Sequence, residues 1–229
     1  MYDALFVSDV HLHETFPQRH ALFCAFLEQK ATQCECLYIL GDFFDYYFGD
    51  DDPCPYQKSV ADALKKLSDK GVKIKIMRGN HDFLLADGFM QQAGAVRIED
   101  PTIIKHKDQK ILLSHGDGWC TKDISYQRLR KIIHNRFLQW CFLRLKVSWR
   151  KYLITTIDKK NKSHYKSISL ECFDVVDQSA IEALEKYQCD TTIHGHTHRC
   201  GVHIYGKKMR YVMGNWNKNG SYLSLNNDG

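Results

Sequence analysis

Long apolar runs are missing from this chain of 229 residues, and no stretch approaches the ~20 residues that a transmembrane helix needs. The opening residues, Met1 to Leu5, lack the basic and then apolar pattern of a signal peptide. There are only four prolines and neither repeats nor low-complexity tracts, which excludes solenoids and proline-rich linkers. The 44% of hydrophobic and 26% of charged residues are typical of globular proteins, so we expect one soluble, cytoplasmic domain over residues 1–229.

A disulfide framework is not expected either, although the chain has nine cysteines. Their number is odd, a secretory signal is lacking, and Cys34 and Cys36 have no second pair at zinc-site spacing. We therefore expect reduced thiols in the core or on the surface.

Acidic residues are scarce in one segment. Residues 122–166 carry thirteen Lys or Arg and only two acids, Asp123 and Asp158, which gives this segment a charge of +11. The whole chain has a net charge of +5, which leaves −6 for the remainder. Such a basic segment predicts an anionic partner: phosphate, nucleic acid or lipid headgroups.

Short apolar runs that end in polar residues predict the buried strands of an α/β protein. These runs are residues 5–7, 36–40, 72–77, 111–113 and 191–193. Helical spacing of apolar residues predicts helices over 20–30 and 57–69. The segments 201–205, 209–213 and 221–225 predict short strands in a C-terminal meander. Residues 122–168 interrupt the series as a basic, apolar, helical segment, which we call the insertion.

Candidate metal ligands follow all five predicted strands. They are Asp9, His11, Asp42, Asn80, His115, His194 and His196. Ligands of open α/β sheets bind outside the carboxyl ends of the strands, so these side chains are expected to converge. Carboxylate, imidazole and amide groups suit Mn, Fe or Zn, and seven ligands suit two ions ~3.5–4 Å apart that share a carboxylate.

Each of these short motifs is weak alone, because a lone Asp-x-His or Gly-Asp is more often a surface loop or a turn. Five of them at successive strand ends are a specific pattern. Beside them, His81 is the expected catalytic residue, either as a general acid or as a group that stabilises transition-state charge. Asp82 is expected to orient His81.

The motif order Asp-x-His, Gly-Asp, Gly-Asn-His-Asp, His-Gly and Gly-His-x-His resembles the calcineurin-like metallophosphoesterases. This resemblance covers nearly the whole chain and implies a two-sheet α-β-β-α sandwich with a di-metal site. It implies that Asp9, His11, Asp42 and His196 hold one ion. Asp42 then bridges to a second ion, which Asn80, His115 and His194 complete.

A closer resemblance is carried by Gly49-Asp50-Asp51-Asp52-Pro53, by Asn80-His81-Asp82-Phe83-Leu84-Leu85 and by His194-Gly195-His196-Thr197-His198-Arg199. These motifs are similar to those of the UDP-2,3-diacylglucosamine hydrolase family of lipid A biosynthesis. The resemblance implies two divalent ions, with Mn²⁺ preferred, and hydrolysis to UMP and 2,3-diacylglucosamine 1-phosphate. The implied substrate contacts are Asn80, His81, Asp123, Tyr126, Lys159, Ser163, Lys166 and His194. His81 departs from this family, which usually has Arg at that position.

The insertion has two interpretations that the sequence leaves open. It is either an interfacial element at an anionic membrane surface or a set of helices packed on the sheet. By the resemblance it is a lid over the acyl chains, and the protein is peripheral on the cytoplasmic face of the bacterial inner membrane. Nucleic acid is not expected as a partner, and no obligate protein partner is evident. The alternatives are another phosphoesterase acting on a nucleotide or phosphodiester, a structure-directed nuclease, and a metal-free scaffold.

Overall fold

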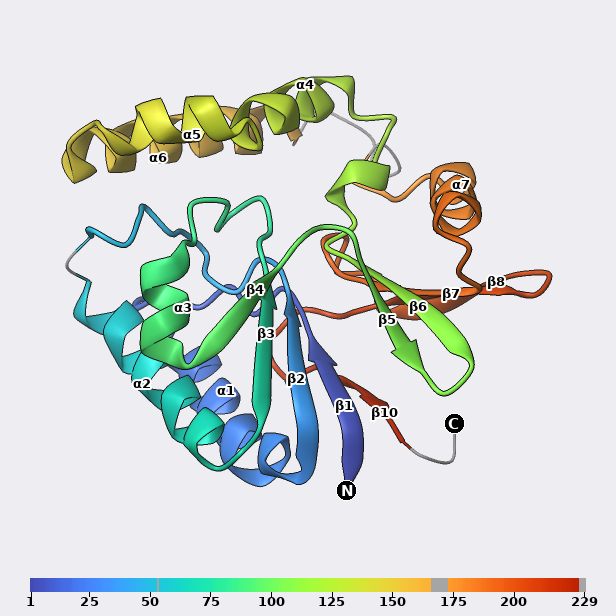
Figure 1. Ribbon diagram of the computed structural model, residues 1–229. Helices are drawn as coiled ribbons and strands as arrows, with labels where there is room; N and C mark the ends of the chain where they lie inside the picture. The colour runs from blue at the N-terminus through green and yellow to red at the C-terminus, as the bar shows by residue number, and fades with distance from the viewer. Residues whose placement is uncertain (53, 166–172, 227–229) are drawn as a thin grey trace.

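Two five-stranded sheets pack face to face, with helices on both outer faces, in a computed structural model that describes residues 1–52, 54–165 and 173–226 (Figure 1). Between the sheets lies an apolar cluster to which both contribute, including Phe6 and Leu40 from the first and Leu113 and Ile193 from the second. The expected α-β-β-α sandwich is confirmed.

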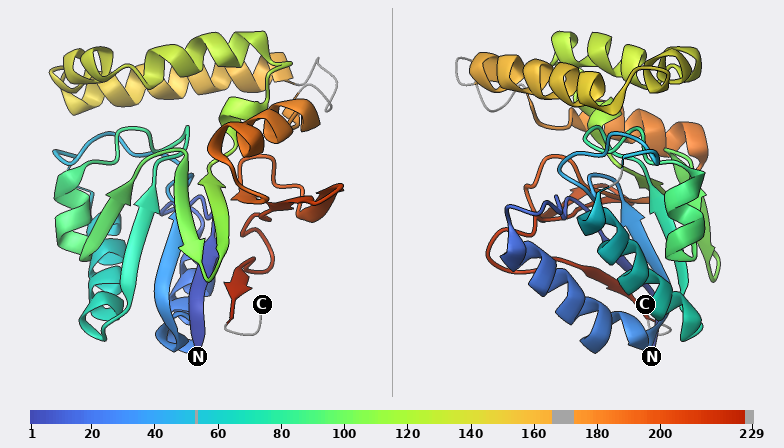
Figure 2. Two further views of the ribbon diagram at one scale, coloured as in Figure 1. Left: turned by 45° about the vertical axis from the view of Figure 1, so that its right-hand side comes forward. Right: turned by 90° about the vertical axis from the view of Figure 1, so that its left-hand side faces the viewer.

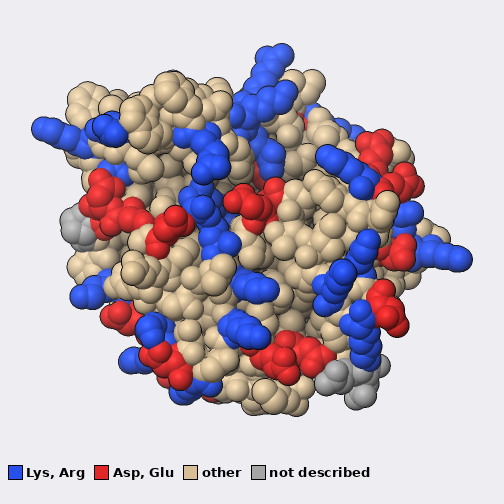
Figure 3. Space-filling view, viewed as in Figure 1, with Lys and Arg blue, Asp and Glu red and all other residues tan. Residues whose placement is uncertain are grey.

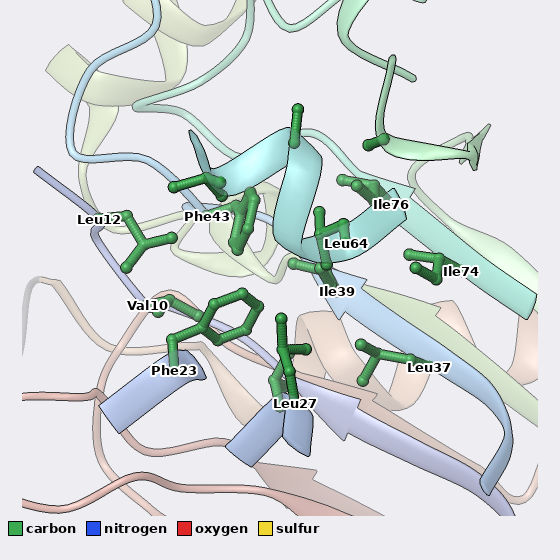
Figure 4. Close-up of a cluster of buried hydrophobic side chains, with 14 of the residues drawn as sticks. Val10, Leu12, Phe23, Leu27, Leu37, Ile39, Phe43, Leu64, Ile74 and Ile76 are labelled. Atoms are coloured by element: carbon green, nitrogen blue, oxygen red, sulfur yellow. The ribbon is translucent and has the colours of Figure 1, made fainter. Parts of the chain in front are cut away.

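The first sheet has the order β10-β1-β2-β3-β4. Its parallel strands are β1 (Tyr2–Val7), β2 (Cys34–Leu40), β3 (Lys73–Met77) and β4 (Ala95–Ile98). Alternate residues of a strand point to opposite faces, so Leu5 and Val7 face the helices while Ala4 and Phe6 face the second sheet. The outer face is covered by α1 (Pro17–Gln29), α2 (Pro55–Asp69) and α3 (Asp87–Ala93), with a 3₁₀ turn, η1 (Ala31–Gln33), before β2 (Figures 1 and 4).

The second sheet has the order β5-β6-β7-β9-β8. Its strands are β5 (Thr102–His106), β6 (Gln109–Ser114), β7 (Thr191–His194), β8 (Gly201–Tyr205) and β9 (Lys208–Val212). Helix α7 (Asp177–Tyr187) covers its outer face through Leu184, which packs on Leu112. The 3₁₀ turn η2 (Asp117–Trp119) follows β6.

The five predicted strands and both predicted helices are present. The prediction that the last three strands form a C-terminal meander is wrong. Strands β8 and β9 form an antiparallel hairpin, whereas β10 (Leu223–Leu225) crosses to the first sheet and pairs with β1. A meander requires neighbouring strands to pair in one sheet; here the free edge of β1 takes up the last strand instead. The expected thiols are observed, because the eight cysteines in the described ranges are all unpaired.

The insertion forms α4 (Ile124–Ile133), α5 (Arg136–Leu143) and α6 (Val147–Tyr165), which lie together as a layer above the carboxyl ends of the strands (Figures 1 and 2). Asp123 caps α4 by accepting a hydrogen bond from the Tyr126 N–H at 2.9 Å, and Asn135 caps α5. Across the described residues, every helix is too short or too polar to span a membrane.

Candidate di-metal site

The loops after β1 and β7 bring together Asp9, His11 and His198. The Nε2 atom of His198 lies 3.2 Å from Asp9 Oδ1 and 3.2 Å from His11 Nε2. Two imidazole nitrogens and a carboxylate oxygen that point at one another are the donor set of a divalent transition-metal ion.

The loops after β2, β3 and β6 build a second group next to the first. His115 Nε2 lies 3.5 Å from Asp42 Oδ1 and 3.1 Å from Asn80 Oδ1, and His196 completes the group with Asp42 and His115. The other Asp42 oxygen, Oδ2, lies 3.7 Å from His11 Nε2. Asp42 therefore faces both groups, as a carboxylate shared between two ions must.

Hydrogen bonds orient the ligands His115 and Asp9. The Nδ1–H of His115 donates to the Leu40 carbonyl at 3.0 Å, which leaves Nε2 directed at Asp42 and Asn80. Both oxygens of Asp9 accept from the His196 N–H, at 3.0 and 2.9 Å. Such supporting contacts orient ligands before an ion binds.

The backbone of the site is held in the left-handed region that non-glycine residues rarely adopt. Asp9, His11, Asp42, His196 and His198 have φ values of +53°, +49°, +49°, +69° and +58°. Such conformations cost of order 1–3 kcal/mol each and concentrate at functional sites. At Gly195, a Cβ atom would collide with Ser8 and Asp9, so only glycine allows this loop to reach the β1 loop.

The structure corrects one predicted ligand, because His194 does not reach either group. Its Nδ1–H donates to the Gly195 carbonyl at 2.8 Å, and its Nε2 lies 3.3 Å from Nη1 of Arg210, a nearly buried side chain. Both ring nitrogens are engaged, so His194 has none to offer to an ion or a substrate. The place predicted for His194, beside Asp42 and His115, is taken by His196. The place predicted for His196, beside Asp9 and His11, is taken in turn by His198.

The electrostatics of the cluster favour cations. Burial alone would raise the pKa of Asp9, but the His198 hydrogen bond and the charges of His115, His198 and His11 hold it well below its usual range. The pKa of Asp42 is likewise lowered, against the effect of burial, by His115, His81 and His11. Without an ion, burial would lower the pKa of His115, yet Asp42 and Asp9 raise it to about 9. The buried carboxylates thus remain anionic and draw positive charge to the cluster.

His81 lies at the edge of the cluster, as expected for a catalytic residue. It is held there by Asp42 and Asp45, and not by Asp82 as predicted. The His81 N–H donates to Asp42 Oδ1 at 2.9 Å, and Nδ1–H donates to the Asp45 carbonyl at 2.9 Å. Asp82 is fully buried and accepts from the N–H groups of Gly79 and Phe43, at 2.7 and 2.8 Å, so its role is to hold the loops. The predicted catalytic role of Asp82 is therefore wrong.

Asp45 is a site residue that the sequence analysis missed. Besides its carbonyl contact with His81, its Oδ1 atom lies 3.4 Å from His11 Nδ1, and the three side chains form a compact group. Burial would raise the pKa of Asp45, but the contact with His11 lowers it. Asp45 thus orients the ligand His11 and the expected catalytic residue His81. The sequence signal that could have indicated it is its position three residues after Asp42, in the same loop.

A cavity of about 590 Å³ opens beside the cluster, between the body and the insertion. Asn80 and His81 lie in its wall, and most of the remaining lining is apolar and comes from the insertion. Leu129, Ile133, Phe142, Leu153 and Ile154 are among these lining residues. The volume is that of a small-molecule site, and the lining favours an apolar ligand joined to a polar group at the metal cluster.

The predicted substrate contacts on the insertion have different fates. Tyr126 lines the cavity, donates to Asp117 Oδ2 at 2.6 Å and stacks on His196 with ring centroids 5.8 Å apart. Asp123 caps α4 instead of lining the cavity. Lys159 is exposed on α6, also outside the lining. The Ser163 side chain and the whole of Lys166 lie outside the described residues.

Polar contacts fasten the insertion to the body. The buried Arg150 donates to the Leu145 carbonyl at 3.1 Å, to the Phe48 carbonyl and to Asp51. At the cavity, the Tyr46 hydroxyl donates to Asp158 of α6. The contacts of Arg150 with Phe48 and Asp51, and of Tyr46 with Asp158, join residues about a hundred positions apart in the chain, so no local sequence pattern indicated them.

The arrangement can hold two divalent ions. Asp9, His11, Asp42 and His198 would hold one, and Asp42, Asn80, His115 and His196 the other. The fit rests on converging nitrogen and oxygen donors in a buried, anionic setting, with no thiolate near them in the described clusters.

Comparisons with known proteins agree with this geometry. Residues 3–200 match the family model described as calcineurin-like phosphoesterase. A protein of Haemophilus influenzae named UDP-2,3-diacylglucosamine hydrolase is 38% identical, over 100% of this chain and 97% of its own length. Proteins with the same name from Neisseria meningitidis serogroup C (39% identical, 100% and 96% covered) and Edwardsiella ictaluri (38% identical, 98% and 89% covered) also match. The chain belongs to the calcineurin-like phosphoesterase family and, within it, groups with the proteins named UDP-2,3-diacylglucosamine hydrolase.

Proposed function

We propose that this protein hydrolyses the pyrophosphate of UDP-2,3-diacylglucosamine to UMP and 2,3-diacylglucosamine 1-phosphate, a step of lipid A biosynthesis. The observation that carries the proposal is the shared wall between the cluster and the cavity, where Asn80 and His81 belong to both. A substrate with acyl chains in the cavity would place its phosphate groups at the metal ligands. The names of the relatives that are 38–39% identical support the same substrate.

Two divalent ions, with Mn²⁺ as the proposed metal, would supply a water of lowered pKa and neutralise charge on the attacked phosphoryl group. The residues of this chain position the reactants. The His81 backbone N–H donates to Asp42 and its ring Nδ1–H donates to the Asp45 carbonyl, which leaves the imidazole Nε2 to contact a phosphoryl oxygen. The apolar cavity wall excludes water from the lipid half, which strengthens the electrostatic contacts at the phosphates.

A substrate panel with holoenzyme tests the function. UDP-2,3-diacylglucosamine is compared with UDP-N-acetylglucosamine, ADP-ribose and bis-p-nitrophenyl phosphate, and kcat/KM is expected to be highest for the diacylated compound. If the unacylated nucleotide sugar or the plain diester is hydrolysed equally well, the protein is a phosphoesterase of broader or different specificity. Cleavage of DNA in preference to all four would assign it to the nucleases.

Substitution in the cavity separates acyl binding from chemistry. Leu129→Trp fills the cavity from α4, and we expect KM for the diacylated substrate to rise more than tenfold, with little change for a plain diester. Ile124→Trp, on the same helix but 63% exposed and outside the cavity, is the matched control. Equal effects of the two variants would contradict acyl binding in this cavity.

The proposal includes peripheral binding of the insertion to an anionic membrane, on the cytoplasmic face of the inner membrane. Phe137, Trp140, Trp149 and Tyr152 are 53–68% exposed on α5 and α6, and the Arg144 guanidinium lies 4.2 Å from the Trp140 ring. Figure 3 displays Lys and Arg side chains beside uncharged surface over the insertion, with acidic groups gathered below it. Exposed aromatic groups beside cations suit a bilayer interface.

Sedimentation with vesicles tests the membrane contact. Binding to vesicles with anionic lipid is expected to exceed binding to neutral vesicles and to weaken with salt. The double variant Trp149→Ser/Tyr152→Ser should lose most of this binding and still hydrolyse detergent-solubilised substrate. Unchanged vesicle binding by the variant would refute a role of this surface.

A further inference from the structure

The metal cluster has a second neighbour besides the cavity, formed by Phe16, Arg19, Asn215 and Asn217, which we call the Phe16 shelf. These residues come from the start of α1 and from the loop between β9 and β10, about 200 positions apart in the chain. The cavity borders the cluster at Asn80 and His81, whereas the shelf borders it at His11 and His198.

Arg19 connects the shelf to the cluster. Its Nη1 donates to the carbonyl oxygen of the ligand His11 at 3.0 Å, and its Nη2 donates to Asn217 Oδ1 at 2.6 Å. The guanidinium lies over the Phe16 ring, 4.5 Å from the centroid. Asn215 Nδ2 lies 3.3 Å from Nδ1 of the ligand His198, so both ends of the shelf touch metal ligands.

The shelf presents the chemistry that recognises a nucleotide. Phe16 is an aromatic residue that is 41% exposed although Arg19 covers one side of its ring, so it can stack on a base. Asn217 is exposed, and its amide N–H₂ can donate to a base edge while its Oδ1 accepts from Arg19. Arg19 adds a cation beside the cluster, where a phosphate group would lie.

The proposed function requires a binding site for a nucleotide next to the metal cluster. Hydrolysis of a nucleoside diphosphate lipid divides the substrate at the metal cluster into a lipid phosphate and a nucleoside monophosphate. The lipid half is assigned to the cavity beyond Asn80 and His81. The nucleoside half therefore extends from the cluster past other ligands, and the shelf lies next to two of them.

Resting on that function, we propose that the Phe16 shelf binds the pyrimidine nucleoside monophosphate half of the substrate. Phe16 stacks on the base, Asn217 donates to a carbonyl oxygen of its edge, and Arg19 orients Asn217 and faces the adjacent phosphate. A donor at this position favours the O4 carbonyl of uracil over the exocyclic amine of cytosine.

Inhibition of the holoenzyme by UMP, CMP and inorganic phosphate tests the shelf. The variants are Phe16→Ala and Asn217→Ala, and Ile103→Ala, which changes a β5 side chain with the same 41% exposure, is the matched control. Since stacking contributes about 1–3 kcal/mol per base, Phe16→Ala should weaken UMP inhibition about 5- to 150-fold, with phosphate inhibition unchanged. Asn217→Ala should reduce the preference for UMP over CMP. Melting temperatures verify that each variant is folded.

The readouts distinguish this inference from the proposed function. If UDP-2,3-diacylglucosamine is hydrolysed but Phe16→Ala behaves like Ile103→Ala towards UMP, the shelf is only a tie between α1 and the C-terminal loop and the inference is overturned. Calorimetric binding of UMP to the holoenzyme that depends on Phe16 supports the shelf even if the lipid substrate is not hydrolysed. In that case the proposed function alone fails.

Discussion

The assignment of His198 rather than His194 as a metal ligand can be tested with two matched substitutions, His194→Leu and His198→Leu. His198 has a 36% exposed side chain that points at Asp9 and His11, whereas His194 is buried and engaged by Gly195 and Arg210. The first variant should lose folding stability and keep the metals, and the second should do the opposite.

The magnitudes follow from the contacts. His194→Leu leaves a buried Arg210 N–H without its acceptor, at a cost of about 1–3 kcal/mol. In a domain of this size that lowers the Tm of the metal-free protein by roughly 2–12 °C. His198→Leu removes one direct ligand. Because even loss of a supporting contact weakens metal binding about 10–100-fold, the loss here should be at least as large.

The assay is thermal unfolding with and without added Mn²⁺, joined to elemental analysis after desalting. A Kd raised 100-fold removes up to about 2.7 kcal/mol of metal-induced stabilisation, so His198→Leu should show a much smaller Tm increase with metal than the wild type. His194→Leu should show nearly the full increase from a lower starting Tm. The reasoning is refuted if His194→Leu loses an ion while His198→Leu retains both.

Three further outcomes are expected. Asp42→Asn should abolish hydrolysis, since it removes the shared carboxylate, while the metal-free Tm changes little; retained activity would exclude the bridging role. Arg150→Met should destabilise the fold by about 1–3 kcal/mol in urea because the Phe48 and Leu145 carbonyls lose their donor. Lys65→Met, which breaks an exposed pair with Asp69 on α2, should cost under about 1 kcal/mol. Burial lowers the pKa of His194 to about 3, with the Arg210 charge acting in the same direction and the Gly195 contact opposing it. Between pH 6.5 and 3, His194 is therefore protonated in the unfolded state but neutral in the folded state, so the free energy of unfolding falls as the pH falls. The stability advantage of wild type over His194→Leu should therefore shrink below pH 6.5, by up to about 1.4 kcal/mol per pH unit, and an advantage that grows in acid would contradict a buried neutral histidine.

The positions of the ligand loops could be predicted from two rules, one on the local sequence pattern of a strand and one on the geometry of parallel sheets. Apolar runs locate the strands, and parallel strands bring their carboxyl ends to one edge, so Asp9, Asp42, Asn80 and His115 meet as expected. The choice among three alternating histidines could not be made from spacing, because His194 and His196 fit an i, i+2 pattern as well as His196 and His198 do. The deciding fact is that His194 is still the last residue of β7, and its ring lies against Trp119 and Arg210 inside the body. The Gly-His-x-His pattern, which begins at Gly195, is the signal that favoured the correct pair.

Two strands, the partner of a third and the role of one carboxylate could not be predicted, each for a physical reason. Strand β4 has only four residues and includes Arg97, and β5 alternates half-buried with exposed residues, so neither is an apolar run. Strand β10 has three residues, and its partner was not predictable because pairing with β1 depends on which sheet edge is open after folding. Asp82 was misassigned because its neighbour His81 suggested a side-chain pair, whereas the buried carboxylate satisfies backbone N–H groups.

The basic residues of the insertion, which first indicated an anionic partner, have two different roles. Some pair with acidic residues of the body, and the others remain for a substrate or a membrane. Arg150 and Lys151 pair with Asp51 and Asp52 of the loop before α2, and Arg130 pairs with the buried Asp117 at 2.8 Å. These three cations hold the insertion over the metal cluster and are partly neutralised by the acidic body. A substrate or membrane is therefore met by a smaller basic surface than the count of +11 suggests. Salt screens exposed charges more strongly than contacts in which one partner is buried, as Asp117 and Arg150 are. Salt should therefore weaken membrane binding well before it loosens the insertion from the body.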